Sequence, residues 1–152
     1  MQVVFHWVRV QTFCYATERR ELLEETMTEL LGTEEFDEEV SEGEHGNVMT
    51  ILESRLTKQR EFNALFKKLG SDIRDWIVED IENRIDDDCV FYIRLDKQKA
   101  VQGIYEVAHH GEVIAVTGKV QAHPAKKEVA VRTLREYLTG LGTDQSDSPG
   151  SS

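Results

Sequence analysis

The chain has 152 residues, of which 39% are apolar and 31% are charged, and its formal net charge is −11 at pH 7. This length and composition predict one globular domain with a substantial core, and no apolar run is long enough to span a bilayer. Residues 1–10 lack the basic start and apolar middle of a secretory signal, so we expect a cytoplasmic protein. So strong a negative charge argues against a nucleic-acid binder that relies mainly on general attraction to phosphates.

Hydrophobic periodicity predicts strands and helices in the first half of the chain. Residues 2–17 are largely apolar on both faces, which is typical of a central strand that is covered on both sides. Gly32 and Gly70 are each placed to end a helix. In chain order, the predicted elements are a strand over 2–17, a helix over 18–31 with Thr17 as its cap, a short acidic edge strand within 34–44, a strand over 48–57, and helices over 58–69 and 71–81.

The second half continues the same pattern after a predicted turn at residues 83–88. Its elements are a strand over 90–95, a short helical turn from residue 97, a strand pair over 104–108 and 112–121, a helix over 125–138 and a disordered tail over 140–152. This order predicts a single α+β domain over residues 1–139, in which one mostly antiparallel sheet is covered by helices.

The charges are unevenly distributed along the chain. Residues 18–44 contain twelve acidic residues against Arg19 and Arg20, whereas residues 94–135 contain eight basic residues against four acidic ones. The second half of the fold can therefore present a basic face in spite of the overall charge.

The stretch from Phe91 to Gly103 is the main candidate for a binding site. Strand alternation places Arg94 at the surface beside aromatic side chains. Asp96 can cap the following helical turn, in which Lys97 and Gln98 come first. A cation, an amide and free backbone donors at one strand end can hold a phosphate or a base edge. Spacing alone favours a simpler interpretation, in which Asp96 caps a connecting helix and the cations are merely solvated.

The segment GEHGN, residues 43–47, is a second candidate. Its glycines allow positive φ or a close approach to a nucleic-acid backbone, while His45 and Asn47 can bind polar groups. A tight turn that enters the next strand explains the same residues, and the sequence alone favours this turn. Further basic candidates lie on the last strand and the last helix: Lys119, Lys126 and Lys127.

Other clusters give little indication of chemistry. Cys14 and Cys89 lack C-x-x-C spacing and fall in predicted strands, which is typical of small buried thiols. The aspartates at 86–88 cannot all converge on one metal ion, and no carboxylates are spaced to complete a site. We find no nucleophile with its base and no phosphate-cradling loop, so we expect no catalytic residues, no metal and no cofactor.

Three segments resemble a small archaeal family of exosome-associated RNA-binding proteins. They are RLDKQKA at 94–100, followed by Gly103, ATE at 16–18, and GEHGN at 43–47, and the likeness covers roughly residues 3–138. The resemblance implies a fold like that of the large-subunit ribosomal protein that binds 5S RNA. The acid-rich surface is also similar to that of proteins from salt-loving archaea, in which salt screens charge and RNA binding depends on hydrogen bonds and stacking.

The resemblance implies a non-catalytic protein that binds structured or ribosomal RNA and acts in RNA processing, with exosome subunits or the ribosome as partners. The residues expected to contact RNA at positions of the family's motifs are Arg94, Asp96, Lys97, Gln98, His45 and Asn47. Lys119, Lys126 and Lys127 are added as supporting cations and do not match those motifs. Two alternatives stay open. One is a metal-dependent RNA hydrolase that uses Asp96 and residues 86–88, and the other is a protein-interaction module whose acidic helix contacts a partner.

Overall fold

The computed structural model describes residues 3–15, 18–33, 36–42, 48–109 and 111–147. Its centre is a five-stranded sheet of order β2-β3-β1-β5-β4, in which every neighbouring pair is antiparallel. The strands are β1 (Phe5–Tyr15), β2 (Asp37–Glu42), β3 (Val48–Leu56), β4 (Val90–Asp96) and β5 (Val113–Val120). The helices are α1 (Arg20–Leu31), α2 (Gln59–Leu69), α3 (Ser71–Glu79), α4 (Ile81–Arg84), α5 (Lys97–Val101) and α6 (Lys127–Asp147). The predicted α+β class is therefore confirmed.

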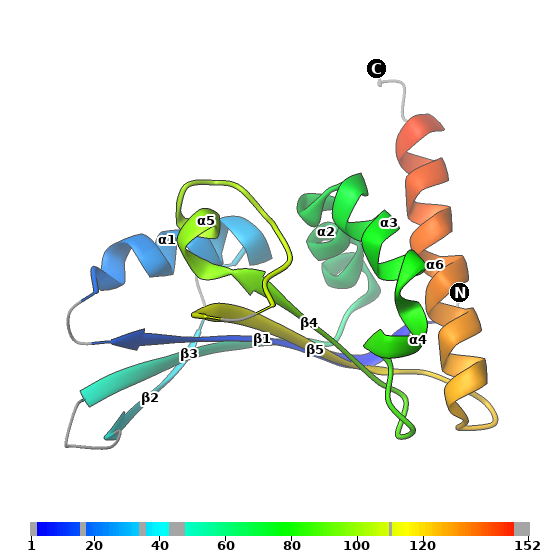
Figure 1. Cartoon of the computed structure of the whole chain (residues 1–152), viewed down its shortest axis with the longest axis horizontal. Coiled ribbons are helices and arrows are strands. Elements are labelled where there is room, and N and C mark those ends of the chain that lie inside the picture. Colours follow the sequence, from blue (N-terminus) through cyan, green and yellow to red (C-terminus); the bar gives the residue numbers. More distant parts are fainter. Residues whose placement is uncertain (1–2, 16–17, 34–35, 43–47, 110, 148–152) are drawn as a thin grey trace.

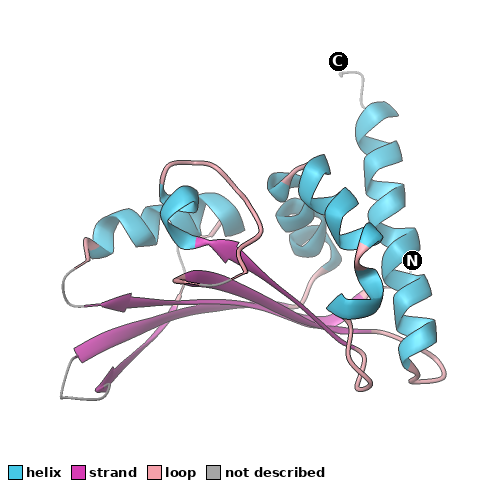
Figure 2. Cartoon of the chain, viewed as in Figure 1, coloured by secondary structure: helices cyan, strands magenta, loops and turns pink. Residues whose placement is uncertain are grey.

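The described helices all lie on one side of the sheet (Figures 1 and 2). Helices α1 and α5 form one group over one end of the strands, and α2, α3, α4 and α6 form a second group over the other end. The strand β1 is central, as predicted, but the expectation that both of its faces are covered is wrong. Along β1 and β5, buried side chains alternate with partly or fully exposed ones, as one-sided packing requires.

We call the sheet surface opposite the helices the open face. The residues that point to it include Trp7, Arg9, Gln11, Phe13 and Tyr15 on β1, Asp37 and Glu39 on β2, Met49, Ile51, Glu53 and Arg55 on β3, Val90, Tyr92 and Arg94 on β4, and Val113, Ala115, Thr117 and Lys119 on β5.

A bulge near the start of β1 separates the core from the open face. The pairing of β1 with β5 shifts register between Phe5 and Trp7, so these two residues lie on opposite faces although they are two positions apart. Phe5 is fully buried, with its ring centroid 5.2 Å from that of Phe62 and 5.7 Å from that of Phe66. Burial of each such ring contributes roughly 1.5–3 kcal/mol. The bulge thus sends one aromatic ring into the core and leaves the next on the open face.

Two predicted segments differ from the structure. Residues 104–108 are not a strand of the sheet, because they make only one bridge, between Val107 and Leu95, and arch along the outer edge of β4. Helix α6 continues to Asp147, so residues 140–147 are helical rather than part of a disordered tail. Its apolar stripe continues from Leu138 to the buried Leu141, and this packing outweighs the helix cost of Gly140, about 1 kcal/mol. No helix in the described part of the chain has the length and apolar character needed to cross a bilayer.

Candidate nucleic-acid interface

The structure separates the two cations that were expected to form one grip. Arg94 lies on the open face, is exposed, and has no hydrogen bond or ion pair from its side chain to another described residue. Lys97 begins α5, which lies on the helix side, and only 1% of it is exposed. The reason is the change from strand to helix at Asp96, which turns the next residues onto the other side of the sheet.

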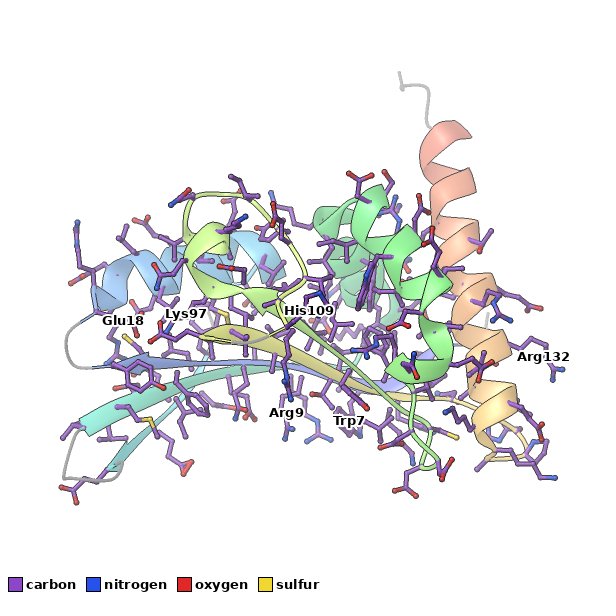
Figure 3. The ribbon with its side chains drawn as sticks, viewed as in Figure 1. Trp7, Arg9, Glu18, Lys97, His109 and Arg132 are labelled. Carbon is purple, nitrogen blue, oxygen red and sulfur yellow. The ribbon has the colours of Figure 1, made fainter. Side chains whose placement is uncertain are left out.

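The ammonium of Lys97 is held by internal partners. Its Nζ lies 2.8 Å from the carbonyl oxygen of Phe13, 2.9 Å from Glu18 Oε1 and 3.4 Å from Glu112 Oε1. It also lies 5.1 Å from the centroid of the Tyr15 ring. Figure 3 shows Lys97 and Glu18 pointing toward each other between β1 and the helix layer. Lys97 therefore joins α5 to the end of β1 and is not available to contact RNA, contrary to the sequence-based expectation.

The other residues of this turn also bond within the chain. Asp96 caps α5 as predicted, since its Oδ1 accepts a hydrogen bond from the backbone N–H of Lys99 at 3.0 Å. Gln98 is exposed and donates from Nε2 to Glu112 at 3.4 Å. The turn from residue 96 to residue 99 is thus a capped structural element, and of the RLDKQ segment only Arg94 reaches the open face.

The remaining predicted residues are scattered. Lys119 lies on the open face, where its Nζ donates to the carbonyl oxygen of Asp88. Lys126 and Lys127 lie at the start of α6, in the helix layer. His45 and Asn47 fall outside the described residues. The structure therefore brings Arg94 and Lys119 to one surface and places the lysines of the last helix in the other layer.

Two arginines that the sequence analysis missed lie on the same surface. Strand register places Arg9 directly opposite Arg55, and the row continues through Thr117 to Tyr92. Like charges directly opposite each other in a sheet are destabilising by up to about 1 kcal/mol. We call the four cations of the open face the cationic patch: Arg9, Arg55, Arg94 and Lys119.

Among the residues that the structure describes, no carboxylate forms an ion pair with either of the two facing arginines. Glu53, which lies two residues before Arg55 on the same face of β3, accepts a hydrogen bond from Gln11 Nε2 at 3.0 Å. The guanidinium of Arg55 instead lies 4.8 Å from the centroid of the Trp7 ring, a cation–π distance. Figure 3 shows Arg9 and Trp7 projecting from the sheet away from the helices. The patch is therefore a preformed set of cations with an aromatic ring beside it.

The cysteines and acidic residues suggest no other chemistry. Cys14 and Cys89 are both free and buried, which confirms the prediction of buried thiols. Burial raises the pKa of the Cys14 thiol, so its reactive thiolate form is disfavoured. Among the described residues, no group of three or more His, Cys, Asp or Glu side chains is arranged to hold a metal ion.

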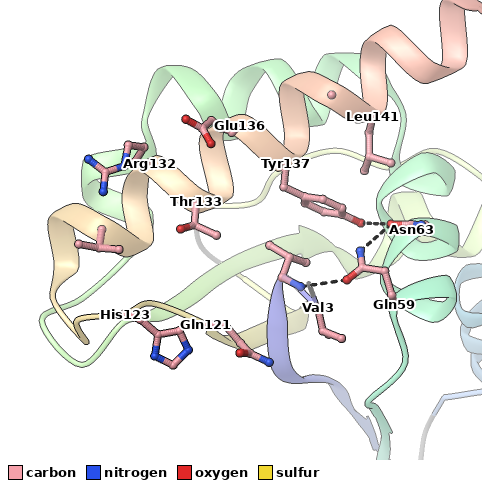
Figure 4. Close-up of a pocket in the computed structure, with 13 residues that line it drawn as sticks. Val3, Gln59, Asn63, Gln121, His123, Arg132, Thr133, Glu136, Tyr137 and Leu141 are labelled. Atoms are coloured by element: carbon pink, nitrogen blue, oxygen red, sulfur yellow. Dashed lines mark hydrogen bonds between the residues drawn. The ribbon is translucent and has the colours of Figure 1, made fainter. Parts of the chain in front are cut away.

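A pocket of about 600 Å³ lies on the helix side, between α6 and the start of β1 (Figure 4). Gln59 accepts the backbone N–H of Val4 at 2.9 Å through Oε1 and donates to Asn63 Oδ1 at 2.9 Å. The Tyr137 hydroxyl donates to the same Asn63 oxygen at 2.6 Å. These polar groups of the pocket wall thus bind one another and fix α2 and α6 to the edge of the sheet.

The fold and the patch together define a class: an α+β protein whose antiparallel sheet carries helices on one face and a cationic, partly aromatic surface on the other. The family model described as RNA binding matches residues 7–120, which include every strand except the first two residues of β1. The chain belongs to this RNA-binding family.

Similar proteins come from several archaea. A protein of Pyrococcus abyssi named RNA-binding protein PAB1135 is 34% identical over 145 residues, which cover 89% of this chain and 94% of that protein. Among solved structures, Mth689 of Methanothermobacter thermautotrophicus, a DUF54 protein, has 33% identity and a TM-score of 0.78, over 89% of this chain and 98% of its own. AF2318 from Archaeglobus fulgidus, also DUF54, has 36% identity and a TM-score of 0.73, over 87% and 98%.

Proposed function

We propose that this protein binds RNA without catalysing a reaction on it, and that the cationic patch holds the RNA backbone on the open face. One observation carries the proposal: Arg9 and Arg55 lie directly opposite each other with no carboxylate bonded to either among the described residues. A phosphate placed across the pair removes their repulsion and can accept paired hydrogen bonds from a guanidinium. Membership of an RNA-binding family supports RNA as the source of that phosphate.

The site can be tested by comparing two variants that each lose two positive charges, one from the cationic patch and one from the helix side. Arg9→Gln with Arg55→Gln lowers the charge of the patch by two, and Arg60→Gln with Arg135→Gln makes the same change on exposed positions of α2 and α6. We expect the patch variant to bind RNA at least about 10-fold more weakly, as expected from the loss of two charged contacts. The slope of log affinity against log salt should fall by about 0.7–0.9 for each lost phosphate contact.

The helix-side variant is the matched control, and it should change neither quantity. Equal losses in both variants would mean that RNA responds only to net charge. Unchanged binding in the patch variant would place the RNA elsewhere on the molecule.

We further propose an accessory role in RNA processing or ribosomal RNA binding, which the motif likeness at residues 94–100 and 43–47 supports. In this role the protein holds RNA while other proteins act on it. The test is copurification from cells with exosome subunits or ribosomes, before and after nuclease treatment, for the natural chain and for the patch variant. An association lost in both the nuclease sample and the patch variant supports a role through RNA. An association that survives both indicates direct protein contact, and the absence of any association refutes the role.

A further inference from the structure

The open face carries exposed aromatic rings as well as cations. Phe13, near the end of the central strand β1, is 38% exposed, and Tyr92, on the edge strand β4, is 39% exposed. Trp7 is half-buried, and its ring lies against the guanidinium of Arg55. Exposed rings cost hydrophobic free energy unless a ligand covers them, so their concentration beside a cationic patch points to a ligand that is both anionic and aromatic.

Two of these rings, Trp7 and Tyr92, have cation–π partners within the chain before any ligand arrives. The guanidinium of Arg55 lies 4.8 Å from the centroid of Trp7. That of Arg84 lies 5.6 Å from the centroid of Tyr92 and 5.3 Å from that of Trp76. Rings fixed in this way lose little conformational freedom on binding, which favours stacking with a ligand.

The spacing of these side chains suits bases that are not stacked on one another. Residues two apart on a strand are about 6.8 Å apart on the same face. This is about twice the 3.4 Å rise per nucleotide along one strand of a duplex. Trp7, Arg9 and Phe13 share the open face of β1. A strand with its bases splayed can therefore place bases on rings and phosphates on arginines along β1.

A duplex does not match this surface in the same way. Its bases are already stacked and their faces are hidden, so proteins recognise duplex RNA mainly through backbone and 2′-hydroxyl contacts. Phe13 and Tyr92 would then lie against sugars and phosphates and gain no stacking. A twofold contact centred on the cationic patch is also disfavoured, since it would bring Arg9 and Arg55 of one copy against the same cations of the other.

We propose that the open face binds single-stranded RNA, with bases stacked on Trp7, Phe13 and Tyr92 and phosphates bound by the cationic patch. This inference rests on the proposed RNA-binding function and adds the form of RNA that the same face selects. Stacking on aromatic side chains tolerates every base, so we expect little sequence preference.

The chain has two tryptophans, so Trp76→Phe leaves Trp7 as its sole tryptophan. We would titrate this variant with a ten-nucleotide single strand of mixed sequence and with the duplex of the same strand, in one buffer. The single strand should quench Trp7 fluorescence and bind at least about 10-fold more tightly than the duplex. Phe13→Leu and Tyr92→Leu should each weaken single-strand binding by roughly 5- to 100-fold, as loss of base stacking does, with an unchanged salt slope.

Ile104→Ala provides the control, because this residue is 46% exposed and apolar but follows α5 on the helix side. It should change neither affinity. One outcome would refute only the preference for single strands: the duplex binds as tightly as the single strand, Trp7 fluorescence is unchanged, and Arg9→Gln with Arg55→Gln weakens the binding of both RNAs. The proposed RNA-binding function would then stand. If neither RNA binds, both proposals fail. A dimer in light scattering that Phe13→Leu abolishes would assign the face to a second copy instead.

Discussion

Lys97→Met should lower the stability of the protein and leave its RNA affinity unchanged. Lys97 and Arg94 are three positions apart in one motif, and the structure gives them opposite roles. The ammonium of Lys97 is bonded to a carbonyl and two carboxylates inside the chain, whereas Arg94 is exposed on the open face. A methionine at position 97 keeps the length of the side chain and removes only its charge and donors.

The magnitude follows from the burial of the partners. Breaking a fully buried ion pair costs about 3–5 kcal/mol, because it leaves a buried charge without a partner. Here the side chains of Glu18 and Glu112 are 22% and 47% exposed, so water can solvate them once Lys97 is gone. We therefore expect a smaller loss, about 2–3 kcal/mol, much of it from the carbonyl of Phe13 that is left without its donor.

The assay is a pair of measurements on the same protein samples. Urea unfolding should give the loss of stability, which for a chain of this size corresponds to a fall in Tm of about 5–10 °C. Fluorescence anisotropy with labelled single-stranded RNA should show that Lys97→Met binds RNA as tightly as the natural chain does. Arg94→Gln should bind RNA more weakly than the natural chain, and its stability should be unchanged. A Lys97→Met variant that is fully stable and binds RNA 10-fold more weakly would refute the structural role of this lysine.

Two further predictions concern the core and the wall of the pocket. Gly118→Ala should destabilise the fold by about 1–3 kcal/mol in urea unfolding, because the added Cβ would lie 3.0 Å from two ring carbons of Phe5. Burial raises the pKa of Tyr137 above its ordinary value, so its stabilising effect is complete below pH 10 and is lost as pH rises. Tyr137→Phe removes the hydroxyl that donates to Asn63, so the variant should be about 1 kcal/mol less stable than the natural chain at pH 7. Its stability should also fall less steeply above pH 10 than that of the natural chain. An equally steep fall in both proteins would contradict this prediction.

The sequence predicts elements well where periodicity and end signals agree. Gly32 ends α1 in the left-handed region, with φ of 73°, and Asp96 caps α5, as expected. The open face was not predictable, because Trp7, Phe13 and Tyr15 make one side of β1 look as apolar as the other. The bulge after Phe5 adds to this, since it moves Phe5 to the opposite face from these three residues.

The candidate site was only partly predictable, for a physical reason. Arg94 was found because a charged residue within an alternating strand must point away from the core. Arg9 and Arg55 carry the same signal, but their juxtaposition depends on the register of β1 and β3, which are joined through α1 and β2. The burial of Lys97 depends on Glu18, 79 positions earlier in the chain. Contacts over such separations are set by tertiary packing and leave no local pattern.

An RNA-binding role can coexist with a net charge of −11 because the charges lie in different places. The acidic strand β2 is at one edge of the sheet, and its Glu38 is already paired with Arg20 of α1. The cationic patch lies on β1, β3, β4 and β5. Asp37 of β2 lies opposite Glu53 of β3 on the same side of the sheet as Arg55, so these two acids are close to that end of the patch. Arg94 and Lys119 lie on the strands farthest from β2, and salt screens acids that are more than about 10 Å from them. The acidic residues on the rest of the surface then limit nonspecific attraction to polyanions, so the affinity for RNA depends on direct contacts with the open face.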